Sequence, residues 1–350
     1  MAAPVRELSY GAAEIYSEET LGVGSYGKVC KAKCGQLPCA AKLLHDTMFG
    51  TNDPGIQRFV ERFEQECQFL RAIKHPNIVQ FLGTSRDPRS RRLALLMELM
   101  DESLTRFLER STGPLPYHTQ LNICQDVALA LAYLHSNDII HRDLSSNNVL
   151  LIGEGSRAKV TDFGMSKLEG MNPRMTPLTM CPAYMPPEAL ITPPRYSSKL
   201  DCFSHGVLTI QIATRQFPNP GDANQYIRDP RFPTGRVLVQ FPETERRKKD
   251  IDLVAPDHPL LPLALHCLKD RDTERPSADE LCGRLATLKR EPRYTHSVEQ
   301  SREQNMSLQA LQQQIEEKDS ELERVRANHE TELHQCHATF QQHLRERDSE

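Results

Sequence analysis

The stretch HRDLSSNN at residues 141–148 constrains this chain more than any other part of its sequence. It places a carboxylate, Asp143, and a carboxamide, Asn148, five residues apart in a short polar segment. Apolar residues precede it, and the strand-like run 149–152 follows it. Transfer of a phosphoryl group to a hydroxyl needs a carboxylate to orient the acceptor and oxygen ligands to hold Mg²⁺. The stretch therefore predicts a loop suited to this chemistry.

A glycine-rich run, G-x-G-x-x-G-x-V, occupies residues 22–29 near the start of the chain. Glycines allow a backbone to lie close to phosphates and to offer them N–H groups. By itself the run fits a dinucleotide-binding turn or an ordinary hairpin equally well. A dinucleotide-binding turn opens a helix, whereas here a second strand-like segment follows at 38–44, with Lys42 inside it. A lysine buried in an apolar strand needs a partner; the alternative is a lysine on a solvent-facing edge.

The partner expected for Lys42 comes from the next helix. Apolar residues at three- and four-residue steps predict a helix over 55–74, which ends before Pro76. Glu66 lies on the apolar side of this helix, unlike its other glutamates. A carboxylate within reach would keep Lys42 protonated.

Three further segments along the chain have recognisable patterns. Residues 93–100 are typical of a buried strand that runs into a connector, and an apolar stripe predicts a helix over 119–136. Residues 159–164 form a strand that ends in Asp-Phe-Gly, which begins at Asp162. The tripeptide alone is a weak signal, but it gains weight behind a strand and downstream of Asp143.

This series resembles the catalytic domain of the eukaryotic protein kinases, with H-R-D-L-x-x-x-N and D-F-G as its most specific motifs. The resemblance covers about residues 15–290 and is closest to the serine/threonine kinases of the tyrosine-kinase-like group. It implies an α+β fold of two lobes: a small, mostly antiparallel β lobe over 16–97, a hinge over 98–101 and a mostly helical large lobe over 102–290. Residues 1–15 would be an N-terminal lead-in.

The resemblance also implies roles for the matching catalytic residues. Asp143 would orient the hydroxyl of a protein substrate for in-line attack, with Arg142 beside it. Lys42, held by Glu66, would position the α- and β-phosphates of ATP. In such a mechanism the protein supplies mainly positioning and electrostatic stabilisation.

The family pattern further implies a nucleotide and metal site in the cleft between the lobes. Asn148 and Asp162 would hold Mg²⁺. Met97 would be the gatekeeper residue, and the backbone of the hinge that starts at Glu98 would bind adenine. The residues expected to bind ATP are Leu21, Gly22, Val23, Gly24, Ser25, Gly27, Val29, Ala40, Lys42, Met97, Glu98, Met100, Asn148 and Asp162.

Two departures from the family pattern lie close to the transferred phosphate. Serine/threonine kinases usually carry Lys two residues after the catalytic Asp, and tyrosine kinases carry Arg two or four residues after it; here Ser145 and Asn147 stand there. Serine/threonine kinases also show Gly-Thr shortly before Y-M-x-P-E, and that Thr ties the substrate-binding loop to the Asp and Lys. Here 179–188 read TMCPAYMPPE, which fits a replacement or a short deletion. A missing cation would cost about 3 kcal/mol of transition-state stabilisation, so we expect low activity.

The same region bears on which hydroxyl accepts the phosphate. Residues 184–188 lack the Trp that tyrosine kinases carry before M-A-P-E, and the whole chain has no Trp. This favours serine/threonine specificity; a tyrosine or dual-specificity kinase is the alternative.

Residues 165–185 have the length and place of an activation loop, and they lack hydrophobic periodicity. An arginine beside the catalytic Asp commonly binds a phosphate on this loop and orders it. Arg142, with Thr176 or Thr179 as the phosphorylated residue, gives a regulatory hypothesis; the alternative is that these are ordinary loop threonines.

Three residues match positions that shape the large lobe of the family. Glu188 follows two prolines where A-P-E is expected, and Arg275 matches the arginine that pairs with this glutamate. Asp201 matches the aspartate that braces the catalytic-loop backbone from the start of the central helix.

The composition changes beyond residue 290, where Gln, Glu, Arg and His dominate. After a linker over 291–300, we expect a coiled-coil helix over 301–350 that forms a homo- or heterodimer. Its heptad positions are Leu308, Leu311, Ile315, Leu322 and Val325, with Lys318 interrupting one core position and a phase slip to Leu333, Phe340 and Leu344. A lone helix and a disordered tail are the alternatives.

Charge and cysteine content limit the partners and the compartment. A formal net charge of −4 gives no electrostatic reason to expect nucleic acid as a partner. We expect no membrane span, because no apolar run approaches the length that one needs, and the N-terminal residues lack a secretory h-region. The 10 cysteines have no metal-site spacing, which favours reduced thiols in a cytoplasmic protein.

Three functions remain in competition. An active protein kinase is favoured, because the set of catalytic residues is complete. A pseudokinase scaffold, which would bind nucleotide and act through its tail, is the main alternative. A small-molecule kinase is disfavoured by Glu188 and Arg275, which belong to the protein-kinase large lobe.

Overall fold

The computed structural model divides the chain into two compact units, Met1–Glu291 and Pro292–Glu350. The residues that it describes are 13–23, 27–44, 71, 73–86, 93–153, 155–162, 167–168, 181–189, 197–218, 226–228, 236–238 and 247–347. Within the second unit, side chains are described up to residue 329.

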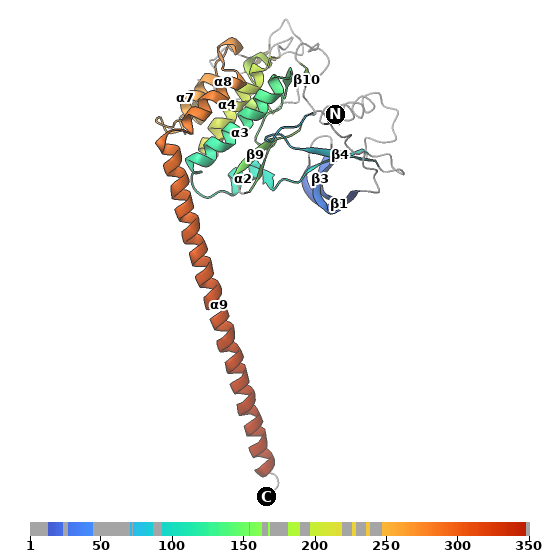
Figure 1. Cartoon of the computed structure of the whole chain (residues 1–350), viewed down its shortest axis with the longest axis vertical. Helices are drawn as coiled ribbons and strands as arrows, with labels where there is room; N and C mark the ends of the chain where they lie inside the picture. The colour runs from blue at the N-terminus through green and yellow to red at the C-terminus, as the bar shows by residue number, and fades with distance from the viewer. Residues whose placement is uncertain are drawn as a thin grey trace. The chain divides into compact units, whose positions relative to one another are not determined.

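The first part of unit one is a five-stranded antiparallel sheet with the strand order β1-β2-β3-β5-β4 (Figure 1). Its strands are β1 (Ala13–Val23), β2 (Gly27–Cys34), β3 (Leu37–Leu44), β4 (Phe81–Arg86) and β5 (Leu93–Glu98). Gly35, in the two-residue turn between β2 and β3, has a φ of 60°, which glycine adopts without steric cost. β1 begins at Ala13, just before the predicted end of the N-terminal lead-in over 1–15.

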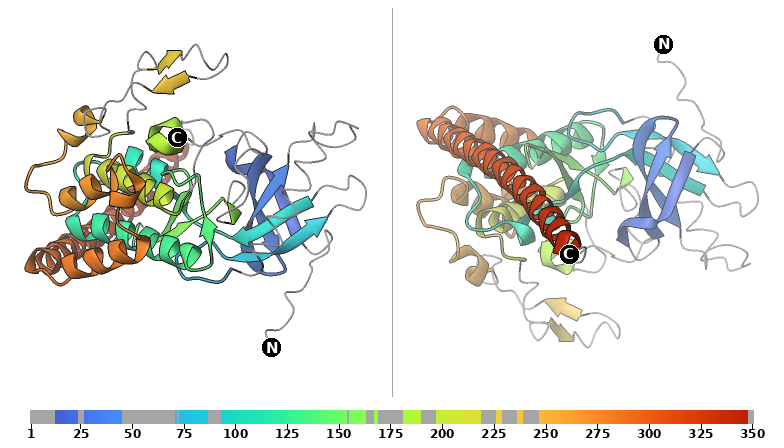
Figure 2. Two further views of the ribbon diagram at one scale, coloured as in Figure 1. Left: turned by 90° about the horizontal axis from the view of Figure 1, so that it is seen from above. Right: turned by 90° about the horizontal axis from the view of Figure 1, so that it is seen from below.

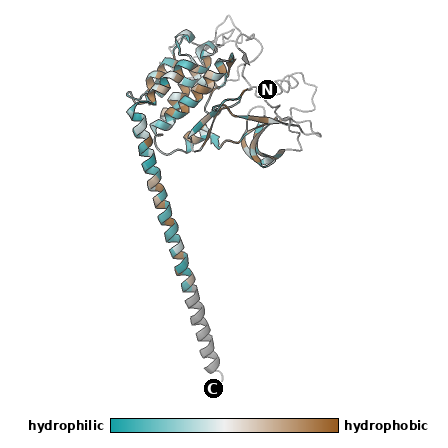
Figure 3. Cartoon of the chain, viewed as in Figure 1, coloured by the Kyte–Doolittle hydropathy of each residue, from teal (hydrophilic) through white to brown (hydrophobic). Residues whose placement is uncertain are grey.

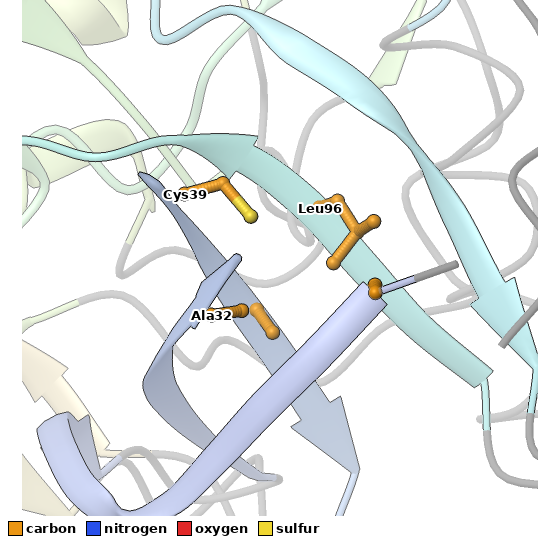
Figure 4. Packing of buried hydrophobic residues seen from close by; sticks show 5 residues of the cluster. Ala32, Cys39 and Leu96 are labelled. Carbon is orange, nitrogen blue, oxygen red and sulfur yellow. The ribbon is translucent and has the colours of Figure 1, made fainter. Parts of the chain in front are cut away.

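One face of this sheet carries a small hydrophobic cluster (Figure 4). Its buried members are Ala13, Ala32, Cys39, Ala41 and Leu96, with Ile15, Cys34 and Leu82 packed against them. Successive side chains of a strand point to opposite faces. Ala40 and Lys42 of β3 therefore lie on the other face, which is the one predicted to meet ATP.

The predicted helix over 55–74 and its Glu66 lie outside the described residues, apart from the end of that segment. The chain that follows docks on the large lobe. Val79 N donates to Val160 O at 3.0 Å, and Val160 N donates to Asn77 O at 2.9 Å. His75 stacks on Tyr133, with ring centroids 4.9 Å apart.

The large lobe is mainly helical. Its described α-helices are α2 (Leu104–Arg110), α3 (Tyr117–His135), α4 (Lys199–Thr214), α6 (Lys248–Ile251), α7 (Leu261–Cys267) and α8 (Ala278–Leu288). Short 3₁₀ turns occupy Pro182–Tyr184, Pro187–Ala189 and Asp272–Glu274. The helix predicted over 119–136 is α3, within two residues at each end. With the antiparallel sheet, this confirms the predicted α+β, two-lobed kinase-like fold.

Small sheets complete the large lobe. β6 (Glu102–Ser103), β8 (Val149–Ile152) and β9 (Arg157–Val160) form one, and β7 (Ile139–Ile140) pairs with β10 (Lys167–Leu168). β11 (Tyr226–Arg228) and β12 (Arg236–Leu238) pair with each other. Figure 2 shows this yellow pair apart from the small-lobe sheet, on the side of the helices.

Helix α4 lies at the centre of the large-lobe core. It is buried from Leu200 to Ile212 and packs against α3 and α7. A side chain at Gly206 would collide with Cys267 and the Ala264 carbonyl of α7, so only glycine allows this close approach. Helix α8 packs on α3 and begins with a capping box formed by Ser277 and Glu280.

The second unit is a single helix, α9 (Pro292–Arg347), of 56 residues. Residues 292–300, which the sequence predicted as a linker, are helical in the structure and belong to α9. A disordered tail is likewise not what the structure shows. No helix in the described ranges combines the length and apolar character that a membrane crossing requires.

Candidate active site

The catalytic-loop backbone is fixed by a carboxylate from α4. Asp201 accepts hydrogen bonds from His141 N at 2.8 Å and from Arg142 N at 2.9 Å. His135 Nε2, at the end of α3, lies 2.9 Å from the same carboxylate. Burial by itself would raise the pKa of Asp201, but the hydrogen bond and charge of His135, with the other donors, lower it below its usual value. The aspartate therefore stays ionised in the core and holds the loop.

The carboxylate of Asp143 is held from two sides. Asn148 Nδ2 donates to Asp143 Oδ2 at 3.0 Å and to the Asp143 carbonyl at 2.8 Å. Cys181 N donates to Asp143 Oδ1 at 3.3 Å. Burial is the main cause that raises the pKa of Asp143, and the nearby negative charge of Asp162 adds to it. These bonds fix the orientation of the group that the sequence predicted to meet the acceptor hydroxyl.

His141 links this loop to the strand that precedes Asp162. Its Nδ1 accepts a hydrogen bond from Asp143 N at 3.3 Å, so the ring proton lies on Nε2. Nε2 donates to the Thr161 carbonyl at 2.9 Å. One imidazole thus ties the two segments that carry Asp143 and Asp162.

Lys42 of β3 and Asp162, which follows β9, form an ion pair. Lys42 Nζ lies 2.9 Å from Asp162 Oδ1, and the side chains are 21% and 44% exposed. Asp162 has a φ of 64° and Arg142 a φ of 70°, a conformation that non-glycine residues rarely adopt. Such strain is held where the surrounding structure over-determines it, commonly at functional sites. The predicted partner of Lys42, Glu66, lies outside the described residues.

Strand register brings several of the predicted ATP-binding residues together. Val29 pairs with Gly22 and Lys42, and Ala40 pairs with Met97. Leu21, Gly22 and Val23 form the end of β1, and Gly27 begins β2. Gly24 and Ser25 lie outside the described residues.

Only some backbone N–H groups of the predicted hinge are available to bind adenine. Glu98 N already donates to Gln80 O at 3.0 Å. The Glu98 carboxylate accepts from Lys159 Nζ at 2.7 Å and from Gln80 N at 2.6 Å. The Met100 N–H makes no hydrogen bond within the part of the chain that the structure describes. Of the predicted hinge residues, Met100 therefore offers a donor to a ligand and Glu98 does not.

Lys159 and Tyr184 brace this site through contacts that sequence reasoning missed. Lys159, in β9, pairs with the hinge through Glu98. The Tyr184 hydroxyl lies 3.0 Å from Ser146 Oγ and also hydrogen-bonds Gln211, and burial raises the pKa of Tyr184 to about 12. No local pattern marks these contacts, because they join residues far apart in the sequence.

The segment around Glu188 is anchored as the family pattern implied. Arg275 NH1 and NH2 lie 2.6 Å and 2.8 Å from the two Glu188 oxygens. The Arg275 side chain is fully buried and lies 4.9 Å from the centroid of the Phe203 ring. Arg247 NH2 adds a bond of 2.7 Å to the Ala183 carbonyl. This segment therefore packs firmly on the large lobe beside Asp143.

The structure places both departures from the family pattern, the missing cation and the missing Gly-Thr. Ser145 is only 3% exposed, whereas Asn147 is exposed. Cys181 stands three residues before Tyr184, and its backbone N–H makes the tie to Asp143. This favours a replacement over a deletion, with a main-chain donor in the contact. Thr176 and Thr179 lie outside the described residues, while Arg142 is buried.

The oxygen atoms of Asn148 and Asp162 are suitable ligands for Mg²⁺. Because Asn148 Nδ2 makes both bonds to Asp143, its amide oxygen is the atom that can take a cation, beside the Asp162 carboxylate. Mg²⁺ prefers such oxygen ligands and is usually held by one or two carboxylates together with substrate phosphates. Within the described residues, no three His, Cys, Asp or Glu side chains gather as a metal cage. The residues present therefore fit an ion shared with a nucleotide.

The chain belongs to the protein kinase domain family, whose model matches residues 15–285. It is 32% identical over 272 residues to the probable serine/threonine-protein kinase kinX of Dictyostelium discoideum, covering 77% of this chain and 23% of that protein. It is 32% identical over 211 residues to the dual specificity protein kinase shkC of the same organism, covering 59% of this chain and 40% of that protein. It is 31% identical over 202 residues to serine/threonine-protein kinase STY17 of Arabidopsis thaliana, covering 57% and 34%.

These relatives are longer proteins, and the match spans less than half of each of them. Family membership carries the general use of ATP and Mg²⁺. The tyrosine-kinase-like group, the domain boundaries and the roles of individual residues stay predictions.

Proposed function

We propose that the chain is an ATP-dependent protein kinase that phosphorylates serine and threonine hydroxyls of protein substrates in signalling. The observation that carries this is the fixed Asp143 carboxylate, held by Asn148 and the Cys181 N–H beside the Lys42–Asp162 pair. A carboxylate in this arrangement can accept a hydrogen bond from an incoming hydroxyl and aim it at a phosphoryl group.

The nucleotide would lie on the sheet face that carries Ala40 and Lys42, with adenine against Met97 and the Met100 N–H. Lys42 would bind phosphate oxygens. Its ion pair with Asp162 supports this, because it places the ammonium group beside the carboxylate that would hold Mg²⁺. Mg²⁺, when bound by Asp162 and the Asn148 amide oxygen, would neutralise charge that develops on the phosphates.

Serine/threonine specificity is supported by the names of most of the relatives, and a dual-specificity relative keeps tyrosine as an alternative acceptor. The absence of Trp from the chain points the same way.

A second candidate is favoured by Ser145. With Ser in place of the expected Lys, the chain lacks a cation that would contact the transferred phosphate. A slow kinase that acts mainly as a nucleotide-binding scaffold fits this feature. Its tail would recruit the partner.

We further infer a cytoplasmic setting. The described cysteines are all free thiols, which suits a reducing compartment.

The test is transfer of labelled γ-phosphate from Mg-ATP to a generic protein and to the chain itself, followed by phosphoamino-acid analysis. We expect label on serine and threonine, and loss of label when Mg²⁺ is chelated. Label on tyrosine would contradict the specificity. If no label appears while Mg-dependent nucleotide binding persists, the scaffold is the better description.

A further inference from the structure

Helix α9 exposes a line of large apolar side chains. Leu308, Leu311, Ile315, Leu322 and Val325 are 56%, 55%, 59%, 52% and 61% exposed. Figure 3 shows scattered apolar residues on an otherwise hydrophilic helix. The second unit contains no other described element, so nothing within it covers this line. Long helices in water are generally stabilised by packing of such a face.

The spacing of the line is that of a coiled coil. Leu308, Ile315 and Leu322 recur every seven residues, which makes them a positions, and Leu311, Lys318 and Val325 take the d positions. A single polar residue in the core reduces stability and disfavours registers that would place it against apolar residues of the other strand. Lys318 is such a residue.

The flanking charges identify the second strand. In a parallel coiled coil, a g residue of one strand faces the e residue of the next heptad on the other. With this register, Glu321 at g faces Arg326 at e of the second copy, and Gln314 faces Asp319. Asp319 also takes the e position beside the Lys318 layer. No like charges face each other in these pairs, so the seam is self-complementary.

We propose that α9 pairs with a second copy of this chain as a parallel, in-register dimer, with reciprocal Glu321–Arg326 ion pairs across the seam. Both kinase units are then joined to the same end of the coil, because each continues directly into α9 at Pro292. The inference does not depend on catalytic activity.

A charge exchange tests the proposal on the full chain, by sedimentation equilibrium at low ionic strength. Glu321→Arg and Arg326→Glu each turn two attractive pairs of the dimer into two repulsive ones, and should raise its dissociation constant about tenfold or more. The double variant should restore nearly the wild-type value.

The rescue cannot arise within one helix. Residues five apart do not face each other on a helix, and the helix neighbour of Glu321 is Lys318, at 3.0 Å. The double variant would leave that contact repulsive. Glu317→Arg and Arg324→Glu, at c positions outside the seam, are the matched controls and should leave the dissociation constant unchanged.

Three results would overturn the proposal. One is a monomer at all concentrations tested, with circular dichroism showing that the helix is intact, which would indicate a different partner chain. Another is a trimer or larger assembly. The third is a double variant weaker than either single variant, which would indicate an antiparallel or shifted pairing.

Discussion

At the scale of single residues, Ser145 is where the site departs most from the family pattern. Its side chain is 3% exposed and follows Asp143 at the position where a cation is expected. Preorganised charges beside a transferring group are among the largest contributions to catalysis. In the proposed mechanism, Lys42 and bound Mg²⁺ would supply that charge.

We predict that Ser145→Lys raises the rate of phosphate transfer by about tenfold or more, which corresponds to about 1.4 kcal/mol of transition-state stabilisation. The matched control is Ser145→Met, which adds a long stem without the charge and should give no gain. Initial rates at saturating Mg-ATP measure the effect. An equal gain from Met would show that packing, and not charge, limits the rate.

Asp201 gives a pH prediction at the same scale. Its pKa in the folded protein is lowered below that of the unfolded chain, which is about 3.9. The unfolded state therefore binds more protons in the window below that value, and the stabilisation from Asp201 is full above it and lost as the pH falls.

We expect the melting temperature of the wild type to fall more steeply between about pH 4 and about pH 2 than that of Asp201→Asn, which starts lower. Asp252→Asn, at an exposed position, should follow the wild-type slope. Parallel slopes for wild type and Asp201→Asn would show that this carboxylate does not carry the acid sensitivity.

At the scale of elements, the buried pair between Glu188 and Arg275 fixes the segment 181–189 to the rest of the large lobe. Arg275 also donates to the Lys269 carbonyl at 2.7 Å, so its cation stays in place when Glu188 is removed. Breaking a buried pair leaves an uncompensated charge and costs more than the pair itself contributes.

We predict that Glu188→Ala lowers the free energy of unfolding by about 3–5 kcal/mol. The double variant Glu188→Ala/Arg275→Met should lose less than the sum of its single variants. Glu274→Ala, which removes the exposed partner of Arg271, should cost less than about 1 kcal/mol. Urea unfolding measures all four; strict additivity would contradict a direct interaction.

Some elements and contacts of the structure could be predicted from the sequence, and others could not. Periodicity located α3 to within two residues, since its apolar stripe is a local signal. The match of Asp201 and Arg275 to family positions predicted contacts that the structure shows. The contacts of His135 with Asp201, of Lys159 with Glu98 and of Tyr184 with Gln211 could not be predicted, because no local pattern reports which distant groups meet. Residues 292–300 were predicted as a linker and are helical in the structure, because a short segment with only Tyr294 and Val298 one turn apart gives too weak a periodic signal to predict a helix.

At the scale of the whole molecule, the two units carry separate hypotheses. The catalytic residues lie in the unit Met1–Glu291, and the heptad seam lies in the unit Pro292–Glu350. The charge exchange in α9 tests assembly without reference to catalysis, and phosphate transfer tests catalysis without reference to assembly. If the dimer hypothesis fails, the kinase hypothesis is unaffected, and the reverse also holds.

Asp143→Asn is the most direct test that this unit is a working kinase. The substitution keeps the shape of the side chain but removes the base, while the Lys42–Asp162 pair is untouched. We predict that single-turnover transfer of γ-phosphate falls by about 10²–10⁴-fold, with the affinity for Mg-ATP unchanged. Transfer by the variant at the wild-type rate would contradict the role of Asp143 and, with it, the proposed kinase activity.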